Sequence, residues 1–447
     1  MMIQAKSKLD LIKRFFLEHN FFRNVTILAG GTALAQGILL IATPIITRVY
    51  SPEQYGIYGA YLSVLSIILV VASLRYELAI SLPEKDDTAA NLMGLSLIIV
   101  AIVGIVTVVI IKLFWPTILK WIQVPALKEY IWLLPVSVLG AGSYQVISFW
   151  SVRKKTFDVL AKTKLRQSIG KALSQLGLGF TGFGVFGLLI GQLIGDTAGC
   201  GTLLSDAIKR NKHDLKKISF VGICSVARKY WRFPVYATPS KMLSVATVQM
   251  PMLFIIAYFG AEKAGWFALA QLVLGAPVSF IIVSVFNVFW SEASQLAKDN
   301  PKKLRELFFR VVRTLLFVCL PMAIIIVFSP TIFPIVFGQQ WTGAGILARN
   351  LGLMYITQFI IMPISILSIF ELQHWETAWN LLCCIGTIAC FAIGNHFCWE
   401  LNQTVLLLGN FLGLANILLF YLNIKAINKN INNFQYLREE YDGKHNI

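Results

Sequence analysis

Long apolar runs alternate with short polar breaks along almost the whole chain. Most runs reach the roughly 20 residues that an α-helix needs to cross a hydrocarbon core. The pattern therefore predicts about twelve membrane-spanning helices. The expected spans are 25–47, 55–80, 89–114, 130–152, 166–183, 184–208, 233–258, 264–290, 314–337, 343–370, 376–396 and 402–424.

The stretch 166–208 needs a length argument, because its only break is the glycine cluster TGFGVFG. A single helix of about 40 residues would extend roughly 60 Å, about twice the thickness of a bilayer core. We therefore expect a tight hairpin of two spans. In the second span, Gly187, Gly191, Gly195 and Gly199 recur at every fourth position. This spacing is typical of a ridge of small residues that lets helices pack closely in lipid.

Composition strengthens the membrane assignment. Of the 447 residues, 57% are hydrophobic and 14% are charged, and the mean hydropathy is +0.69. Soluble domains carry about 25% charged residues. The seven cysteines form no CxxC pair, so we interpret them as small apolar fillers and expect no metal. No GxxxxGK[ST] motif occurs, so the chain is not expected to hydrolyse ATP, and no cofactor is expected.

The net charge of +17 is explained by topology. With a cytoplasmic N-terminus, the inner segments hold 31 Lys and Arg residues and the outer segments hold six. Cytoplasmic loops retain Lys and Arg, so we expect both termini in the cytoplasm. This accounts for the basic charge and removes the case for a nucleic-acid partner.

The longest basic loop, 209–232, divides six predicted spans from six. We therefore expect an all-α integral membrane protein with two six-helix lobes, at 25–208 and 233–424. Segment 1–24 places apolar residues along one helical face, which is typical of a helix lying on the membrane surface. Residues 425–447 would form a cytoplasmic tail.

The turn TRVYSPEQYGIYGAY at 47–61 recurs in altered form as AYFGAEKAGWFALA at 257–270. Tyr50, Glu53, Gly56 and Tyr58 have counterparts at Phe259, Glu262, Gly265 and Phe267, all at an offset of about 209 residues, and Pro44 pairs with Pro251 after a small slip. Six spans in each half would give both halves the same orientation. The sequence thus predicts a parallel repeat about an axis along the membrane normal, as in transporters whose two bundles rock around a central site.

Four stretches carry a resemblance to a known family. They are RVYSPEQYGIYGAYLSV, LRYELAISLPEKDDTAANL, FWSVRKKTFDVLAKTK and the run that begins FPVYATPSKMLSVATVQ. The chain resembles the polysaccharide transporter family, which includes the Wzx-type O-antigen flippases of the multidrug/oligosaccharidyl-lipid/polysaccharide flippase superfamily. The resemblance implies a twelve-span, two-lobed flippase of the bacterial inner membrane. Its cargo would be undecaprenyl-diphosphate-linked oligosaccharide for lipopolysaccharide or related polysaccharide biosynthesis.

Ionisable residues inside spans are costly, so each is a functional candidate. Lys241 lies about ten residues into the seventh span, roughly 15 Å from its start. It is either a cation that attracts a diphosphate in the cavity or half of a buried ion pair. Asp196 lies at a comparable depth, one turn beyond Gln192. It is either an ion-coupling site or the partner that neutralises Lys241.

Arg48 and Arg75 lie near span ends. Arg48 stands on the outer side, where cations are scarce, whereas Arg75 is expected near the cytoplasmic surface. Each either binds substrate or has only a structural or topological role. Glu77 does not share a helical face with Arg75, so we expect it in a surface or interlobe contact. Lys171, near the start of its predicted span, is expected to extend to the membrane surface.

Sugar recognition would need aromatic and amide groups in a wet cavity. Six amides lie inside predicted spans, and each has the alternative of bonding a neighbouring helix. They are Gln36, Gln145, Gln175, Gln249, Asn287 and Gln358.

Three functions remain in competition. The first is the flippase, with membrane lipids, a polysaccharide polymerase and chain-length proteins as partners. The second is an ion-coupled small-molecule or multidrug antiporter of the same superfamily, for which Asp196 is the supporting residue. The third is a membrane polymerase or glycosyltransferase, which would carry a large extramembrane loop. Every predicted outer loop here is short, so we expect a transporter and not an enzyme.

Overall fold

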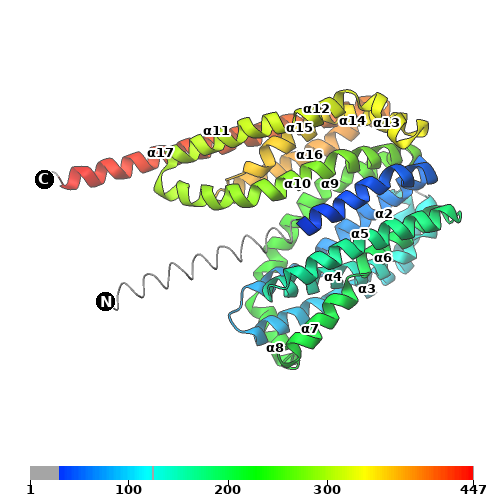
Figure 1. The fold of residues 1–447 in the computed structure, drawn as a ribbon, viewed down its shortest axis with the longest axis horizontal. Coiled ribbons are helices and arrows are strands. Elements are labelled where there is room, and N and C mark those ends of the chain that lie inside the picture. The colour runs from blue at the N-terminus through cyan, green and yellow to red at the C-terminus, as the bar shows by residue number, and fades with distance from the viewer. Residues whose placement is uncertain (1–29, 123–124, 446–447) are drawn as a thin grey trace. The chain divides into compact units, whose positions relative to one another are not determined.

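The computed structural model describes residues 30–122 and 125–445, and within these ranges it contains helices and no strands (Figure 1). The predicted interfacial segment 1–24 lies outside the described residues. Contacts divide the chain into two compact units. The first comprises residues 1–49, 68–117 and 129–239, and the second comprises residues 50–67, 118–128 and 240–447. Residues 50–67, which include part of the repeated turn and the first part of the following helix, therefore group with the C-terminal half.

The first unit is built from helices that follow one another with short breaks. In order they are the helix Gly30–Val49, the end of α2 (Pro52–Val71), η1 (Tyr76–Ser81), α3 (Asp86–Ile122), η3 (Ile131–Leu133), α4 (Leu134–Arg153), α5 (Phe157–Phe180), α6 (Gly184–Thr197), α7 (Cys200–Leu215), α8 (Phe220–Lys229) and η4 (Phe233–Ala237). The short η2 (Pro125–Glu129) precedes η3.

The second unit holds the remaining helices. They are α9 (Thr238–Phe259), α10 (Ala261–Asp299), α11 (Pro301–Val318), α12 (Leu320–Val327), α13 (Ser329–Phe337), η5 (Gln339–Trp341), α14 (Thr342–Asn350), α15 (Gly352–Ile361), η6 (Met362–Ile364), α16 (Gln373–His396) and α17 (Leu401–His445). Helix α17 packs against α11, α14, α15 and α16. It is therefore a central element of this unit.

Among the described residues, nine helices are long and apolar enough to cross a membrane, and two bent pairs raise the number to eleven. The first pair bends by 41° between α11 and α12, where Pro321 removes a backbone donor and crowds the preceding turn. The second pair bends by 53° between residues 350 and 352. Together these eleven match eleven of the predicted spans.

The remaining predicted span, 166–183, falls within α5, which begins earlier at Phe157. Helix α5 contains Lys162, Lys164, Arg166 and Lys171 and is therefore too polar to pass the same hydropathy criterion. Its partner α6 begins at Gly184, after a turn in which Gly182 has a φ of 82°. The predicted hairpin is confirmed as a pair of helices, of which α6 belongs to a candidate membrane span.

The glycines of α6 pack as their spacing predicts. A Cβ on Gly191 would overlap Gln175 of α5, and a Cβ on Gly195 would lie 2.8 Å from Cβ of Lys171. Glycine thus allows the two helices to approach closely, which stabilises helix pairs where lipid supplies no hydrophobic driving force.

The two copies of the repeated turn each join two helices, as predicted. Ser51 and Gln54 form a capping box at the start of α2: Ser51 N donates to Gln54 Oε1 (3.1 Å), and Gln54 N donates to Ser51 Oγ (3.3 Å). This reciprocal pair satisfies two free helix donors. Gly260, with a φ of 90°, starts α10 in the second copy.

The repeat also has a spatial counterpart within the second unit. A Cβ on Gly56 would overlap the carbonyl oxygen of Ala261, and a Cβ on Gly265 would overlap that of Pro52. Gly56 and Gly265 are equivalent in the repeat, as are Pro52 and Ala261. A contact in which each residue meets its partner's counterpart is what a two-fold relationship generates.

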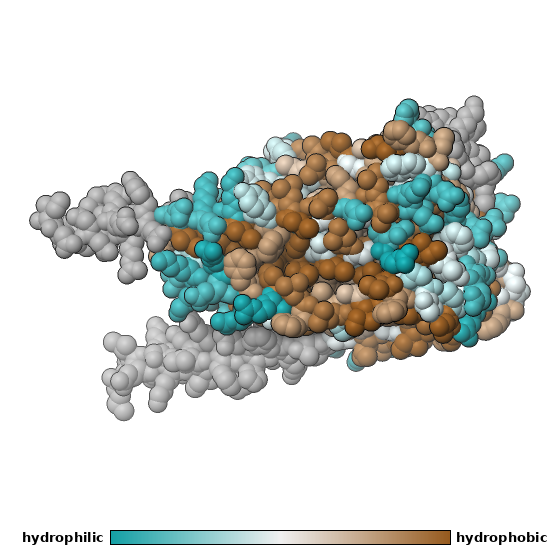
Figure 2. All heavy atoms as spheres, turned by 90° about the horizontal axis from the view of Figure 1, so that it is seen from above, coloured by the Kyte–Doolittle hydropathy of each residue, from teal (hydrophilic) through white to brown (hydrophobic). Residues whose placement is uncertain are grey.

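Apolar side chains gather in a broad band across the face in Figure 2, with hydrophilic side chains concentrated toward its two ends. Many large apolar residues are exposed, among them Phe317, Ile335 and Leu414. Exposure on this scale is unfavourable in water but favourable in lipid. The protein is a multi-pass membrane protein.

Candidate functional site

A cavity of about 580 Å³ lies inside the second unit, among α9, α10, α15, α16 and α17. Pro251 lines it from within α9. Its polar and aromatic lining residues are Lys241, Ser244, Thr247, Phe267, Gln271, Ser279, Tyr355, Gln358, Trp379, Asn380 and Asn416. Ligand pockets in proteins span about 300–1,000 Å³ and combine apolar walls with a few polar groups. This cavity has both features.

Lys241 lines the cavity from the first turn of α9 and is exposed. It is eight residues beyond Phe233, where the continuous helical run Phe233–Phe259 begins. At 1.5 Å per residue this is about 12 Å along the helix. Lys241 therefore lies in the first half of this helical run, and its depth in the membrane stays a prediction.

Several polar side chains of the cavity wall are held in place by hydrogen bonds within the protein. Trp379 Nε1 donates to the carbonyl oxygen of Ala415 (2.7 Å), and Asn380 Nδ2 donates to that of Glu376 (3.0 Å). Asn416 Nδ2 donates to Thr357 Oγ1 (2.9 Å). Fixed groups lose little conformational entropy when a ligand binds. These side chains of the wall are therefore held in fixed positions.

Of the five predicted amides whose side chains the structure describes, Gln358 alone lines the cavity, and Asn287 lies outside this set. Gln145 donates to Glu77 Oε1 (3.0 Å), and Gln175 donates to the carbonyl oxygen of Leu188 (3.1 Å). These two stabilise helix packing in the first unit. The sequence did not identify four further lining residues, Gln271, Asn380, Asn416 and Trp379. In a helix that is apolar on every side, the spacing of hydrophobic residues does not show which side borders a cavity.

Arg75 does not belong to a span, contrary to the sequence-based placement. Helix α2 ends at Val71, and Arg75 follows in a left-handed conformation with a φ of 62°. Its NH1 group lies 3.2 Å from Glu77 Oε1. Glu77 does not lie on the surface, which was one of its two predicted positions: its side chain is 0% exposed and is bonded within the first unit.

Glu77 is the centre of a buried polar cluster. Besides Arg75, Ser73 Oγ and Gln145 Nε2 both donate to its carboxylate. Three donors from two segments neutralise a carboxylate that would otherwise be costly to bury. The charge of Arg75 is thereby already compensated within its own unit, which favours a structural role for it.

Asp196 of α6 accepts two bonds from Gln192 Nε2, both of 2.9 Å. Its backbone oxygen accepts from Gln167 (3.2 Å). Lys171 and Lys164 supply positive charge to it from α5. Asp196 thus has cations of its own in the first unit and does not require Lys241 for neutralisation.

Lys171 departs from the prediction in its position. It lies fourteen residues into α5 rather than near the start of a span, which is about 21 Å along the helix. It is half-buried against α6. The expectation that Lys171 extends to a nearby membrane surface assumed a helix that begins at residue 166. Helix α5 begins at Phe157 instead.

Arg48 is exposed at the end of the helix Gly30–Val49, immediately before the capping box of α2. It belongs to the first unit, as do Arg75 and Asp196, whereas Lys241 belongs to the second. Within the first unit these three candidates do not form one cluster: Arg75 bonds Glu77, and Asp196 bonds Gln192.

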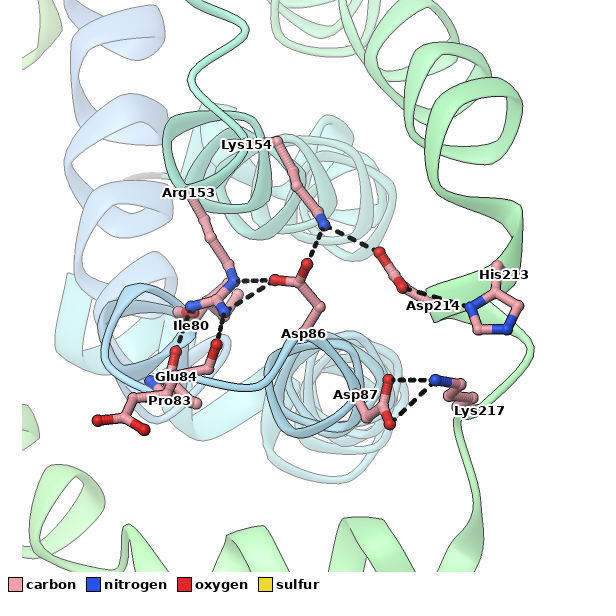
Figure 3. A network of polar contacts seen from close by, with 10 residues as sticks. All are labelled: Ile80, Pro83, Glu84, Asp86, Asp87, Arg153, Lys154, His213, Asp214 and Lys217. Carbon is pink, nitrogen blue, oxygen red and sulfur yellow. Dashed lines mark hydrogen bonds and ion pairs between the residues drawn. The ribbon is translucent and has the colours of Figure 1, made fainter.

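A second polar network joins three helix ends in the first unit (Figure 3). Asp86, at the start of α3, binds Arg153 (2.8 Å) and Lys154 (2.7 Å) from the end of α4. Lys154 also binds Asp214 of α7 (2.9 Å), and Lys217 binds Asp87 (2.9 Å). Burial alone would lower the pKa of Lys154, but its bonds to Asp214 and Asp86 outweigh burial and raise it. This network ties helices together, since its charges satisfy one another.

No cluster of three or more His, Cys, Asp or Glu side chains suited to a metal occurs in the part of the chain that the structure describes. The cavity itself offers amides, hydroxyls, aromatic rings and a cation.

The fold defines the class of protein. It is similar to lipid II flippase MurJ in an inward closed conformation, with a TM-score of 0.68 and 15% identity over 90% of this chain and 89% of that one. It is also similar to an inward-facing multidrug resistance MATE family transporter of the MOP superfamily, with a TM-score of 0.60 and 15% identity over 89% of this chain and 96% of that one. The described residues share the all-helical fold of these transporters.

The family follows from the sequence itself. Residues 45–345 match the family described as polysaccharide biosynthesis protein, and the chain belongs to this family. It is also similar to the succinoglycan biosynthesis transport protein ExoT of Rhizobium meliloti (strain 1021), with 23% identity over 336 residues. That alignment covers 74% of this chain and 64% of the relative. The relatives are named as transporters or flippases, as the sequence predicted, and not as enzymes.

Proposed function

We propose that the protein is a flippase that moves undecaprenyl-diphosphate-linked oligosaccharide from the cytoplasmic to the periplasmic leaflet of a bacterial inner membrane. The cargo is the repeat unit of an O-antigen or a related surface polysaccharide. Membership of a polysaccharide biosynthesis family and similarity to a transport protein and a lipid II flippase support this class of cargo. Transport proceeds by alternating access, since the fold is that of transporters.

The observation that carries the proposal is the cavity that Lys241 borders. Its amides, hydroxyls and Trp379 suit sugar hydroxyl groups and sugar faces, and its cation suits a phosphate. A volume of about 580 Å³ lies within the usual range of ligand pockets and suits part of the polar head of the cargo. In this proposal the lipid tail remains in the bilayer while the polar head crosses.

Lys241→Ala tests this assignment in a strain that lacks the chromosomal gene. Losing a hydrogen-bonded charge costs about 1.5–3 kcal/mol, which is about 10- to 100-fold in affinity. We expect surface polysaccharide to fall sharply at an unchanged amount of membrane protein. Lys241→Arg should retain most of it.

Lys429→Ala is the matched control, because Lys429 is exposed on α17 of the same unit and lines neither described cavity. Surface polysaccharide is measured by gel electrophoresis and staining. Wild-type polysaccharide from Lys241→Ala would remove Lys241 from the cargo site.

An ion-coupled small-molecule antiporter is the second candidate. The similarity to a MATE family transporter and the half-buried position of Asp196 near the α5 cations Lys164 and Lys171 favour it. Under this alternative, Asp196→Asn would abolish drug resistance conferred by overexpression and leave surface polysaccharide intact. Under the flippase proposal, overexpression confers no such resistance.

The partners follow from the proposed cargo. The periplasmic product of flipping is the substrate that a polysaccharide polymerase and a chain-length protein would consume. Both termini are proposed to lie in the cytoplasm, on the basis of the Lys and Arg distribution.

A further inference from the structure

The second unit has a second cavity, of about 550 Å³. It shares no lining residue with the cavity of Lys241. We call it the basic pocket. It is lined by Lys302, Arg305, Glu306, Phe309, Arg310 and Arg313 of α11 and by Ile431 of α17.

The sequence of α11 explains why these side chains lie together. Pro301, Leu304, Phe308 and Leu315 are buried, and the ring of Phe308 stacks on Phe420 of α17 at 5.6 Å. At 100° per residue, the pocket residues fall on the opposite side of the helix. Packing of the apolar side against α17 therefore holds the basic side outward.

The basic pocket carries a strong excess of positive charge. Four cations face one carboxylate, Glu306, and none of them forms an ion pair among the described residues. The basic residues Arg153, Lys154 and Lys217 in Figure 3, by contrast, each bind an Asp. Neighbouring like charges destabilise a helix. An anion from outside the chain would relieve this repulsion.

Apolar surface adjoins the charge. Phe309 is 38% exposed, and its ring lies 5.9 Å from the guanidinium carbon of Arg305. Ile431 adds a half-buried aliphatic group. A ligand with an anionic head and an apolar body would contact both kinds of surface. A free inorganic anion would use only the cations.

We propose that the basic pocket binds the phosphate headgroup of an anionic phospholipid from the cytoplasmic leaflet. Arg guanidinium groups match phosphate geometry. The predicted topology places 292–313 on the cytoplasmic side, where anionic lipids attract basic segments. The proposal does not depend on what the transporter carries. The prenyl diphosphate of the proposed cargo has the same head chemistry, and the test separates the two sources.

The test uses the purified full-length protein in phosphatidylcholine nanodiscs with and without phosphatidylglycerol. Retained lipid is counted by native mass spectrometry, and a titration gives the apparent dissociation constant for phosphatidylglycerol. The variant carries Arg305→Gln, Arg310→Gln and Arg313→Gln. Each surface cation contributes about 1 kcal/mol, so the constant should rise on the order of a hundredfold.

Two further variants control for net charge and for folding. Lys209→Gln, Lys212→Gln and Lys216→Gln remove the same charge from exposed positions of the first unit and should leave the constant unchanged. Arg305→Lys, Arg310→Lys and Arg313→Lys keep the charge and should retain most of the binding, which distinguishes a lost site from a lost fold.

The proposal is overturned if the glutamine variant of the pocket binds phosphatidylglycerol like the wild type, or if the charge control loses as much. A separate titration uses undecaprenyl diphosphate as the probe. If the pocket variant weakens binding of that probe alone, the phospholipid assignment is wrong and the pocket belongs to the cargo lipid.

Discussion

Glu77 is a carboxylate that is completely enclosed by the first unit and has Arg75 as its cationic partner. Removing one partner of a buried pair leaves an uncompensated charge in a medium of low dielectric constant. Such a loss destabilises a protein by about 3–5 kcal/mol, whereas removal of both partners can be nearly neutral. The pair therefore allows a structural role of Arg75 to be separated from a role in substrate binding.

Glu77→Ala should lower the thermal unfolding midpoint of the purified protein, because Arg75 is left without its carboxylate. Arg75→Ala with Glu77→Ala should recover a large part of that loss. Unfolding is followed by the change in intrinsic fluorescence in detergent. An unchanged midpoint in Glu77→Ala would mean that the pair contributes no stability.

The double variant also tests the predicted substrate role of Arg75. If Arg75 is structural, surface polysaccharide per folded protein should stay near the wild-type amount. If Arg75 contacts the cargo, the double variant should be well folded and inactive.

At this scale the sequence predicted some site residues and not others. Lys241 and Gln358 stand out because a charge or an amide inside an apolar run is costly, and both line the cavity. The roles of Gln145 and Gln175 could not be predicted, since their partners Glu77 and Leu188 lie in other segments. An intramembrane amide shows that a partner is needed, but its sequence position does not show whether that partner is a helix or a ligand.

The elements follow the apolar pattern closely, and the exception is informative. Helix α5 is long enough to span a bilayer, but five charged residues, from Asp158 to Lys171, keep its hydropathy low. It lies against α6, whose glycines allow the backbones to approach. The hairpin could be predicted from length alone, whereas the early start of α5 at Phe157 could not, because its first turns are polar.

The crossing of α2 and α10 at Gly56 and Gly265 gives a prediction at the element scale. A methyl group on Gly56 would overlap the carbonyl oxygen of Ala261, which is backbone and cannot rotate away. Gly56→Ala should therefore lower the yield of folded protein or its unfolding midpoint markedly.

Gly177→Ala is the matched control, since a methyl group at Gly177 of α5 would meet no atom within 4 Å. Alanine favours a helix over glycine by about 1 kcal/mol, so this variant should be neutral or slightly more stable. Yield and midpoint are measured by size-exclusion chromatography with fluorescence detection. Equal behaviour of the two variants would contradict close packing at Gly56.

For the whole molecule, the proposed topology can be tested with native cysteines. Cys224 and Cys398 are exposed, while Cys319, Cys383, Cys384 and Cys390 are buried. Cys224 lies in the predicted cytoplasmic loop, and Cys398 follows α16 in a predicted outer loop. The two thiols should therefore lie on opposite sides of the membrane.

A membrane-impermeant maleimide should label Cys398 in intact spheroplasts and Cys224 only after the membrane is disrupted. Cys224→Ser and Cys398→Ser identify each labelled site by mass spectrometry. The reverse pattern would place both termini outside and contradict the topology inferred from 31 inner and six outer cations.

The fold class could be predicted from the sequence because the hydrocarbon core dictates the length of every span. The cavity could not, since it depends on which sides of five separate helices meet. The distribution of Lys and Arg has a second consequence, which the topology did not suggest. Helix α11 brings four cations of the predicted inner side into one pocket. The cations at the end of α4, by contrast, pair with carboxylates of α3 and α7.

The glycine contact between the two turns joins equivalent positions of the repeat. Gly56 meets Ala261 while Gly265 meets Pro52, so a side chain added at either glycine would push apart the same two backbones. A substitution in one copy of the turn therefore disturbs the other copy as well, and the two glycines act as one structural unit.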